Sequence, residues 1–201
     1  MSLAYRLLYR VGFMPWDAKD PASLHQMSAL FDREERGRPA PFGRALDVGC
    51  GTGGPSVELA RRGWQVTGVD AVPQALRRAR ERAREAGVEV EFVEADVTRL
   101  HDHVRGSFRF AIDVGCFHGL DDDQRRAYGR ELTSVTRVDA ALLLMAFSPG
   151  RRGPLPRGAD RAGIESALPG WQITDEEPLD ISAARGLAAK ASPRWYRLAR
   201  V

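Results

Sequence analysis

Cysteine, lysine and long apolar runs are scarce in this sequence. Its two cysteines, Cys50 and Cys116, are too few for a disulfide framework or a four-cysteine metal site. We therefore expect a protein of the reducing cytoplasm, with no metal. No apolar run approaches the roughly 18 residues that a transmembrane helix needs. The apolar spacing at the start of the chain is interrupted by Arg6 and Arg10 and has no cleavage site, so we expect no signal peptide and no membrane partner.

A strong charge of either sign is also missing. The 30 basic and 27 acidic residues leave a net charge of +3, and all basic residues except Lys19 and Lys190 are arginines. So small an excess does not indicate a nucleic-acid-binding surface. The Arg/Glu-rich segment 77–85 is typical of a solvent-facing helix with short-range ion pairs.

From residue 44 onward, strand and helix patterns alternate. Apolar or alternating segments predict strands at 45–50, 64–70, 88–96, 108–115, 140–148, 171–179 and 194–201. Helices are predicted at 54–62, 73–87, 121–137 and 160–168. This alternation predicts an α/β fold with a largely parallel sheet covered on both faces. No helix-length segment joins the last two strands, which suits an antiparallel pair, and the polar segment 151–159 is expected to be a lid rather than core.

The glycine-rich segment DVGCGTGG (47–54) carries the most information. It follows a predicted strand and opens a predicted helix, and its glycines allow a sharp turn and a close approach to a ligand. Asp70 ends the next strand, where a carboxylate can accept two hydrogen bonds from a ribose diol. Gly49, Gly51 and Gly54 with Asp70 also fit the dinucleotide fingerprint, so the spacing alone leaves the ligand open.

Four segments together resemble class I S-adenosylmethionine-dependent methyltransferases. ALDVGCGTGG (45–54) resembles motif I, VTGVD (66–70) the second-strand motif, VEADVTRL (93–100) the third-strand motif and RWYRL (194–198) the last antiparallel strand. The resemblance implies a doubly wound, Rossmann-like sheet of seven strands, mostly parallel, with an antiparallel last strand. It also implies a single domain over residues 1–201, in which 1–43 form a helical N-terminal cover and 44–201 the core.

A narrower resemblance rests on GFMPWD (12–17) and DVGCFHGL (113–120). These segments are similar to the small bacterial branch near the thiopurine, tellurite-resistance and halide/thiol methyltransferases. The Gly and Pro that usually follow Pro-Trp-Asp in that branch are replaced here by residues 18–21, AKDP.

The resemblance assigns roles to individual residues. The loop glycines approach the methionine and ribose parts of S-adenosylmethionine, Asp70 holds the ribose hydroxyls, and Trp16 closes over the sulfonium. The next residues, Asp96 and Val97, address the adenine. The full set of implied cofactor-binding residues is Trp16, Asp47, Gly49, Cys50, Gly51, Gly53, Asp70, Ala71, Asp96, Val97, Asp113, Gly115 and Cys116.

Two histidines are candidate catalytic bases. His118 directly follows the fourth predicted strand, and His25 lies in the N-terminal cover. The competing interpretation of His118 is a structural imidazole that bonds a backbone carbonyl.

These observations predict a methyltransferase that acts on a small molecule, as a monomer or homodimer. A thiol or another soft nucleophile is the first expectation for the acceptor, by family analogy alone, and O- or N-methylation of a secondary metabolite is the alternative. A nicotinamide-dependent oxidoreductase and a non-catalytic cofactor-binding protein remain open, although no Tyr-x-x-x-Lys pair supports the former.

Overall fold

A computed structural model describes residues 21–150, 156–180 and 192–201. Within them, seven strands form one sheet in the order β3-β2-β1-β4-β5-β7-β6. The neighbours from β3 to β5 are parallel, and β7 runs antiparallel to both β5 and β6. The predicted fold class, with its antiparallel last strand, is therefore confirmed. The strands are β1 (Arg44–Val48), β2 (Gln65–Asp70), β3 (Glu91–Glu94), β4 (Phe108–Val114), β5 (Thr136–Ala146), β6 (Trp171–Pro178) and β7 (Arg194–Arg200).

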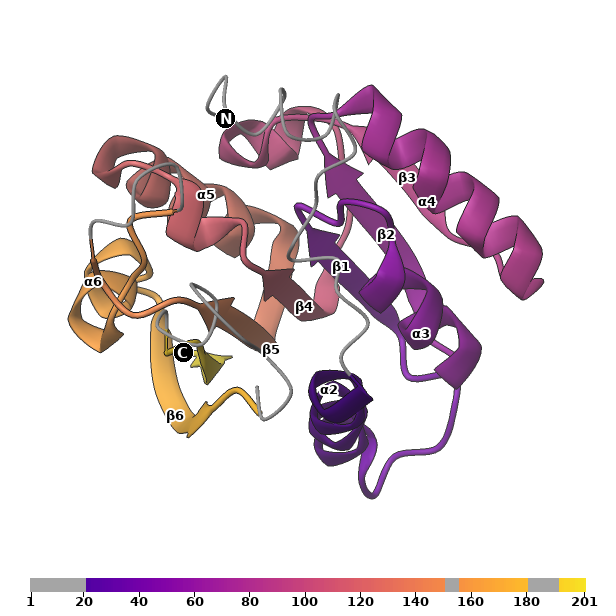
Figure 1. The fold of residues 1–201 in the computed structure, drawn as a ribbon, viewed down its shortest axis with the longest axis horizontal. Coiled ribbons are helices and arrows are strands. Elements are labelled where there is room, and N and C mark those ends of the chain that lie inside the picture. Colours follow the sequence, from indigo (N-terminus) through magenta and orange to yellow (C-terminus); the bar gives the residue numbers. More distant parts are fainter. Residues whose placement is uncertain (1–20, 151–155, 181–191) are drawn as a thin grey trace.

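Helices cover both faces of the sheet, with α2 and α3 on one side and α5 and α6 on the other (Figure 1). The α-helices are α2 (Pro21–Glu35), α3 (Gly54–Arg62), α4 (Pro73–Ala86), α5 (Asp122–Val135) and α6 (Arg161–Ala167). Two 3₁₀ turns, η1 (Val97–Asp102) and η2 (Phe117–Gly119), follow β3 and β4.

Local signals explain where these helices begin and end. Pro55 and Pro73 stand in the first turns of α3 and α4, where a proline loses no hydrogen bond. The helix α4 ends at Gly87, whose φ of 66° suits a left-handed cap. A capping box between Asp121 and Gln124 starts α5.

Each face of the sheet has its own apolar cluster. Phe31 of α2 and Leu59 of α3 pack with Phe110 on one face, and Tyr128 and Leu132 of α5 belong to the cluster on the other. Parallel strands buried on both faces read as continuous apolar runs, which is why β4 and β5 are recognisable in the sequence.

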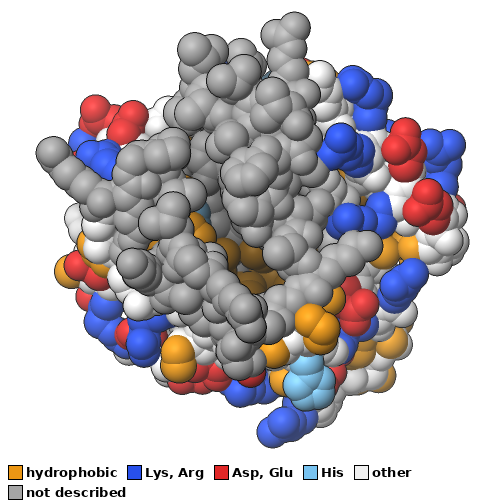
Figure 2. All heavy atoms as spheres, viewed as in Figure 1, with side chains coloured by type: hydrophobic (Ala, Val, Ile, Leu, Met, Phe, Trp, Pro, Cys, Tyr) orange, Lys and Arg blue, Asp and Glu red, His pale blue; other side chains and the backbone are white. Residues whose placement is uncertain are grey.

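The exposed face of α4 agrees with its predicted role. Arg77, Arg78, Glu81 and Arg84 are exposed, whereas Ala79 on the same helix is buried. Basic and acidic side chains are mixed over this side of the molecule (Figure 2). The segment is thus a solvent-facing helix surface with both signs of charge.

Several details differ from the prediction. The strand β5 begins at Thr136, four residues early, directly after α5, and β3 is only four residues long. The turn η1 has no counterpart among the predicted elements. Gly158 and Ala159, expected in a polar lid, are buried, and the Ala159 amide donates to the carbonyl oxygen of Phe147 at 2.9 Å. Residues 1–20, with Trp16, and residues 151–155 of the expected lid lie outside the described residues.

Candidate functional site

The glycine loop between β1 and α3 is a tight backbone turn. Gly49, Gly51 and Gly53 have φ values of 71°, 52° and 74°, a region that favours glycine. The amides of Gly49 and Cys50 both donate to the Val69 carbonyl oxygen, at 2.8 and 2.9 Å. A Cβ on Gly49 would lie 2.6 Å from the Cβ of Cys116. The loop therefore touches β2 on one side and the turn after β4 on the other.

Asp70, at the end of β2, is joined directly to this loop. Its Oδ2 accepts the Gly51 amide at 2.9 Å, and its Oδ1 accepts the Val72 amide at 2.8 Å. The residue is 6% exposed. Burial raises the pKa of Asp70 above its ordinary value, while the amides of Val72, Gly51 and the partly exposed Ala71 oppose the rise. Each carboxylate oxygen has a second lone pair, so Asp70 can still bind a ligand diol.

Asp47, at the start of the glycine motif, joins β1 to the first turn of α3. The Ser56 hydroxyl donates to Asp47 Oδ2 at 2.5 Å, and the carboxyl group is fully buried. Burial raises the pKa of Asp47 to about 7, against the hydrogen bond from Ser56; the nearby charge of Asp113 raises it further. Sequence reasoning missed Ser56, although a hydroxyl in the helix turn beside a motif acid is a usable signal.

Asp113 organises the turn after β4 in the same way. It accepts the Cys116 amide at 2.7 Å and the Phe117 amide at 3.0 Å, and it is fully buried. Burial raises the pKa of Asp113 to about 7, in spite of these hydrogen bonds. Gly115 lies within the turn with φ 88° and is partly exposed. The turn therefore presents Gly115 and Cys116 beside the glycine loop.

Asp96 caps η1, next to the buried Val97. Its Oδ1 accepts hydrogen bonds from the Thr98 amide at 2.9 Å and the Thr98 hydroxyl at 2.7 Å. Partial burial would raise the pKa of Asp96, but the two hydrogen bonds from Thr98 and the charge of Arg99 act against it, and the pKa is lowered. The carboxylate is therefore held ionised at the end of β3.

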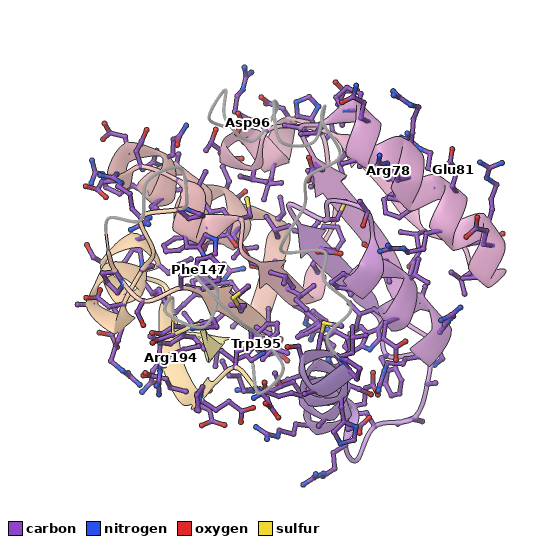
Figure 3. All side chains as sticks on the ribbon, viewed as in Figure 1. Arg78, Glu81, Asp96, Phe147, Arg194 and Trp195 are labelled. Atoms are coloured by element: carbon purple, nitrogen blue, oxygen red, sulfur yellow. The ribbon has the colours of Figure 1, made fainter. Side chains whose placement is uncertain are left out.

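The two candidate catalytic histidines lie on different elements. His118 is 3% exposed in η2, and its ring stacks on Phe147 at a centroid distance of 4.5 Å. Phe147 follows β5 and lies close to Trp195 and Arg194 at the start of β7 (Figure 3). His25 is exposed on α2, a helix whose hydrogen bonds include contacts with Arg62 of α3 and Arg197 of β7. Its neighbours on the helix, Ser23 and Gln26, hydrogen-bond the carbonyl oxygens of Asp180 and Pro178 at the end of β6.

The carboxyl ends of β1, β2, β3 and β4 thus bring most of the predicted cofactor residues to one edge of the sheet. Ligands of open parallel sheets bind at this edge, next to the switch in strand order. The arrangement suits an adenosyl sulfonium compound, because the glycine turn lies beside Asp70 and the buried carboxyl groups of Asp47 and Asp113 would favour a ligand that carries positive charge. Trp16 lies outside the described residues.

Two observations bear on other kinds of site. Among residues 21–150, 156–180 and 192–201, no group of His, Cys, Asp and Glu side chains could hold a metal ion. In the same part of the chain, no helix is both long and apolar enough to cross a membrane.

Comparison with known proteins identifies relatives of this chain. A family model described as "Methyltransferase domain" matches residues 45–139. An uncharacterized methyltransferase of Schizosaccharomyces pombe is 31% identical over 103 residues, which cover 51% of this chain and 70% of the relative. The 2-heptyl-1-hydroxyquinolin-4(1H)-one methyltransferase of Mycobacteroides abscessus is 32% identical over 147 residues, covering 70% of this chain and 64% of that protein.

One solved structure is similar over nearly its whole length. It is titled "Conversion of a Disulfide Bond into a Thioacetal Group during Echinomycin Biosynthesis". The match covers 100% of this chain and 93% of that chain at 27% identity, with a TM-score of 0.74. The likeness extends beyond the glycine loop to the complete sheet.

Proposed function

The chain belongs to the methyltransferase family, and from this premise we propose that it transfers a methyl group from S-adenosylmethionine to a small-molecule acceptor. A thiol or another soft nucleophile is the proposed acceptor class. The observation that carries the proposal is the junction of Asp70 with the Gly51 amide. It joins the carboxylate expected to hold a ribose to the loop expected to approach the ligand.

Each part of the site has a definite task in this proposal. When bound, S-adenosylmethionine supplies a methyl group on a sulfonium sulfur, which a nucleophile displaces in line. The backbone at Gly49, Gly51 and Gly53 would hold the methionyl and ribose parts, with Asp47 and Cys50 ordering the loop. Asp70 and Ala71 would hold the ribose, and Asp96 and Val97 the adenine. Asp113 would fix Gly115 and Cys116 beside the methionyl tail.

Orientation and exclusion of water are the main contributions expected from the protein. When the protein aligns two reacting groups, it removes a large part of the entropy cost of the reaction from the barrier. The buried carboxyl groups of Asp47 and Asp113 would also favour a cationic ligand, since an opposite charge stabilises their ionised forms. Neither contribution needs a proton to be removed from a soft acceptor.

The thiol class is supported by two features. The segments GFMPWD and DVGCFHGL resemble the thiopurine and halide/thiol branch, and the similar solved structure concerns sulfur chemistry by its title. The alternative, O- or N-methylation of a secondary metabolite, is supported by the relative that acts on a hydroxyquinolone. We propose a cytoplasmic monomer or homodimer that works without a nucleic-acid partner.

Calorimetric titration tests the cofactor first. S-adenosylhomocysteine should bind with a dissociation constant in the micromolar range, and reduced nicotinamide dinucleotide should give no heat. The reverse pattern would overturn the assignment in favour of an oxidoreductase. Binding without S-adenosylhomocysteine production from any acceptor would indicate a non-catalytic protein.

An acceptor panel then tests the substrate class. Aromatic and aliphatic thiols are compared with a hydroxyquinolone and a primary amine at equal concentration, and S-adenosylhomocysteine is measured as the product. Turnover of the thiols at least tenfold faster supports the proposal. Faster turnover of the oxygen or nitrogen acceptor would replace it with the alternative.

A further inference from the structure

The side chain of His118 bridges two segments that are distant in the sequence. Its Nδ1 lies 3.0 Å from the backbone nitrogen of Phe147, and that amide donates the hydrogen bond. The imidazole thereby connects η2, after β4, to the end of β5. A backbone amide can only donate, so the identity of the acceptor is unambiguous: Nδ1 carries no proton.

This contact fixes the tautomer of the ring. A neutral imidazole has one protonated nitrogen, so the proton of His118 is on Nε2. A proton on Nδ1 would point at the Phe147 N–H, and the two donors would repel each other. This holds whether the proton is added to the neutral ring or moved from Nε2 to Nδ1. Neither nitrogen can therefore take a proton from an acceptor unless the bond to Phe147 breaks.

The surroundings of the ring hold it in this position. The Phe147 ring stacks on it with an interplanar angle of 26°. A Cβ on Gly115 would lie 3.2 Å from Nε2, so the backbone after β4 also borders the ring. Its exposure of 3% leaves little room for another rotamer.

The charged groups around the turn act on its backbone. Arg125 of α5 donates to the His118 carbonyl oxygen at 3.3 Å and to the Gly158 carbonyl oxygen at 2.6 Å. Asp113 of β4 binds the amides of Cys116 and Phe117. The segment from β5 contributes the apolar Met145 and Phe147.

We propose that His118 is a positioning residue that holds the β4 turn against β5, and that the acceptor thiol reacts as a thiolate formed in solvent rather than by transfer of its proton to His118. The inference rests on the proposed function and deepens it. The thiol proton goes to solvent before the reaction. The thiolate sulfur then forms the new carbon–sulfur bond, and the sulfonium sulfur keeps the electron pair of the bond that breaks.

Nuclear magnetic resonance of the histidine ring nitrogens tests the proposed tautomer of His118, and it needs no catalytic turnover. The chain has four histidines, and the His118 signals are those lost in His118→Asn. We expect an unprotonated Nδ1 and a protonated Nε2 between about pH 6 and 8. A protonated Nδ1 in that range would overturn the proposal, whatever the acceptor proves to be.

A matched pair of variants tests the second half. In His118→Asn, the side-chain oxygen occupies the δ position and can accept the Phe147 amide, but it is no base. In His118→Leu the acceptor is lost at similar volume. We expect kcat/KM to fall less than tenfold in the asparagine variant and at least tenfold further in the leucine variant, with both folded by circular dichroism.

The pH profile separates positioning from base catalysis. For the original protein and His118→Asn, the rise of kcat/KM with pH should follow the ionisation of the thiol used, and shift between an aromatic and an aliphatic thiol. A rise at one pH for both thiols, absent from His118→Asn, would overturn the proposal. Failure of all thiols while a hydroxyquinolone is methylated would refute the thiol proposal, and the ring-nitrogen spectra would still test the histidine.

Discussion

At the scale of single residues, Asp70 has the largest predicted effect on cofactor affinity. A hydrogen bond to a charged group contributes about 1.5 to 3 kcal/mol. We expect Asp70→Ala to weaken S-adenosylhomocysteine binding at least tenfold, because it removes the proposed ribose acceptor and releases the Gly51 amide. Calorimetry measures this effect. Asp123→Asn is the control, since the Asp123 side chain is 91% exposed at the start of α5. An unchanged dissociation constant in Asp70→Ala would remove Asp70 from the site.

Two glycines with similar φ values allow a matched comparison of stability. Gly49 has φ 71°, and a methyl group added there would lie 2.6 Å from Cys116 Cβ, whereas Gly87 has φ 66° and open space. Gly87→Ala should cost about 1 to 2 kcal/mol for the left-handed backbone alone. Gly49→Ala should lower the free energy of unfolding by about 2 kcal/mol more, because the added methyl group also pushes the loop away from the turn after β4. Urea unfolding measures both, and equal costs would contradict the close approach.

Residue identities predict much of the site, but not the hydrogen bonds that orient it. The glycine loop and Asp70 lie where the sequence places them, because a strand, a turn, a helix and the end of the next strand can all be recognised locally. The contact of His118 with Phe147 joins residues 29 positions apart and depends on how β4 and β5 align. This alignment of the two strands cannot be predicted from the sequence of either strand alone.

At the scale of elements, the ion pair between α2 and β7 connects the N-terminal helix to the sheet. Arg197 donates to both oxygens of Glu34, at 2.5 and 3.0 Å, and Glu34 is 6% exposed. Removing one partner of a buried pair leaves an uncompensated charge. We expect Arg197→Met to destabilise the protein by about 3 kcal/mol.

The control for this prediction is on the same helix. Arg33 pairs with Glu177 at 2.7 Å, but its side chain is 44% exposed. Exposed pairs contribute about 0 to 1 kcal/mol, so Arg33→Met should change the midpoint of urea unfolding little. Similar losses in the two variants would show that burial of Glu34 does not decide the effect.

The early start of β5 shows why one element boundary differs from its prediction. Residues 137–139 are exposed, and Val138 is the single apolar residue among them, so their sequence resembles that of a loop. The strand nevertheless begins at Thr136, whose hydroxyl donates to the Leu132 carbonyl oxygen in the last turn of α5. Asp139 then has a positive φ of 72°, and the pairing of β5 with β4 is irregular at this point. Tertiary pairing extends the strand beyond its apolar pattern.

At the scale of the whole molecule, the buried carboxyl groups make stability depend on pH. Asp47 and Asp113 have pKa values of about 7 in the folded protein, against an ordinary value of 3.8. Between these values the folded state binds protons that the unfolded state has released. Stability is therefore lost as pH rises from about 4 through 7, with a slope of at most about 1.4 kcal/mol per pH unit for each group.

The unliganded protein should thus unfold at a higher urea concentration at pH 5.5 than at pH 7.5. Asp47→Asn should reduce this difference, because an amide cannot ionise and one of two mutually repelling charges is gone. The hydrogen bond with Glu131 raises the pKa of His101, so loss of its proton also lowers the stability as pH rises. The part of the pH dependence that disappears in His101→Gln is therefore subtracted as background. If the midpoint were flat across this range in the original protein, the two carboxyl groups would be ionised in the folded state, and the polar surroundings of the loop would then compensate their burial in full.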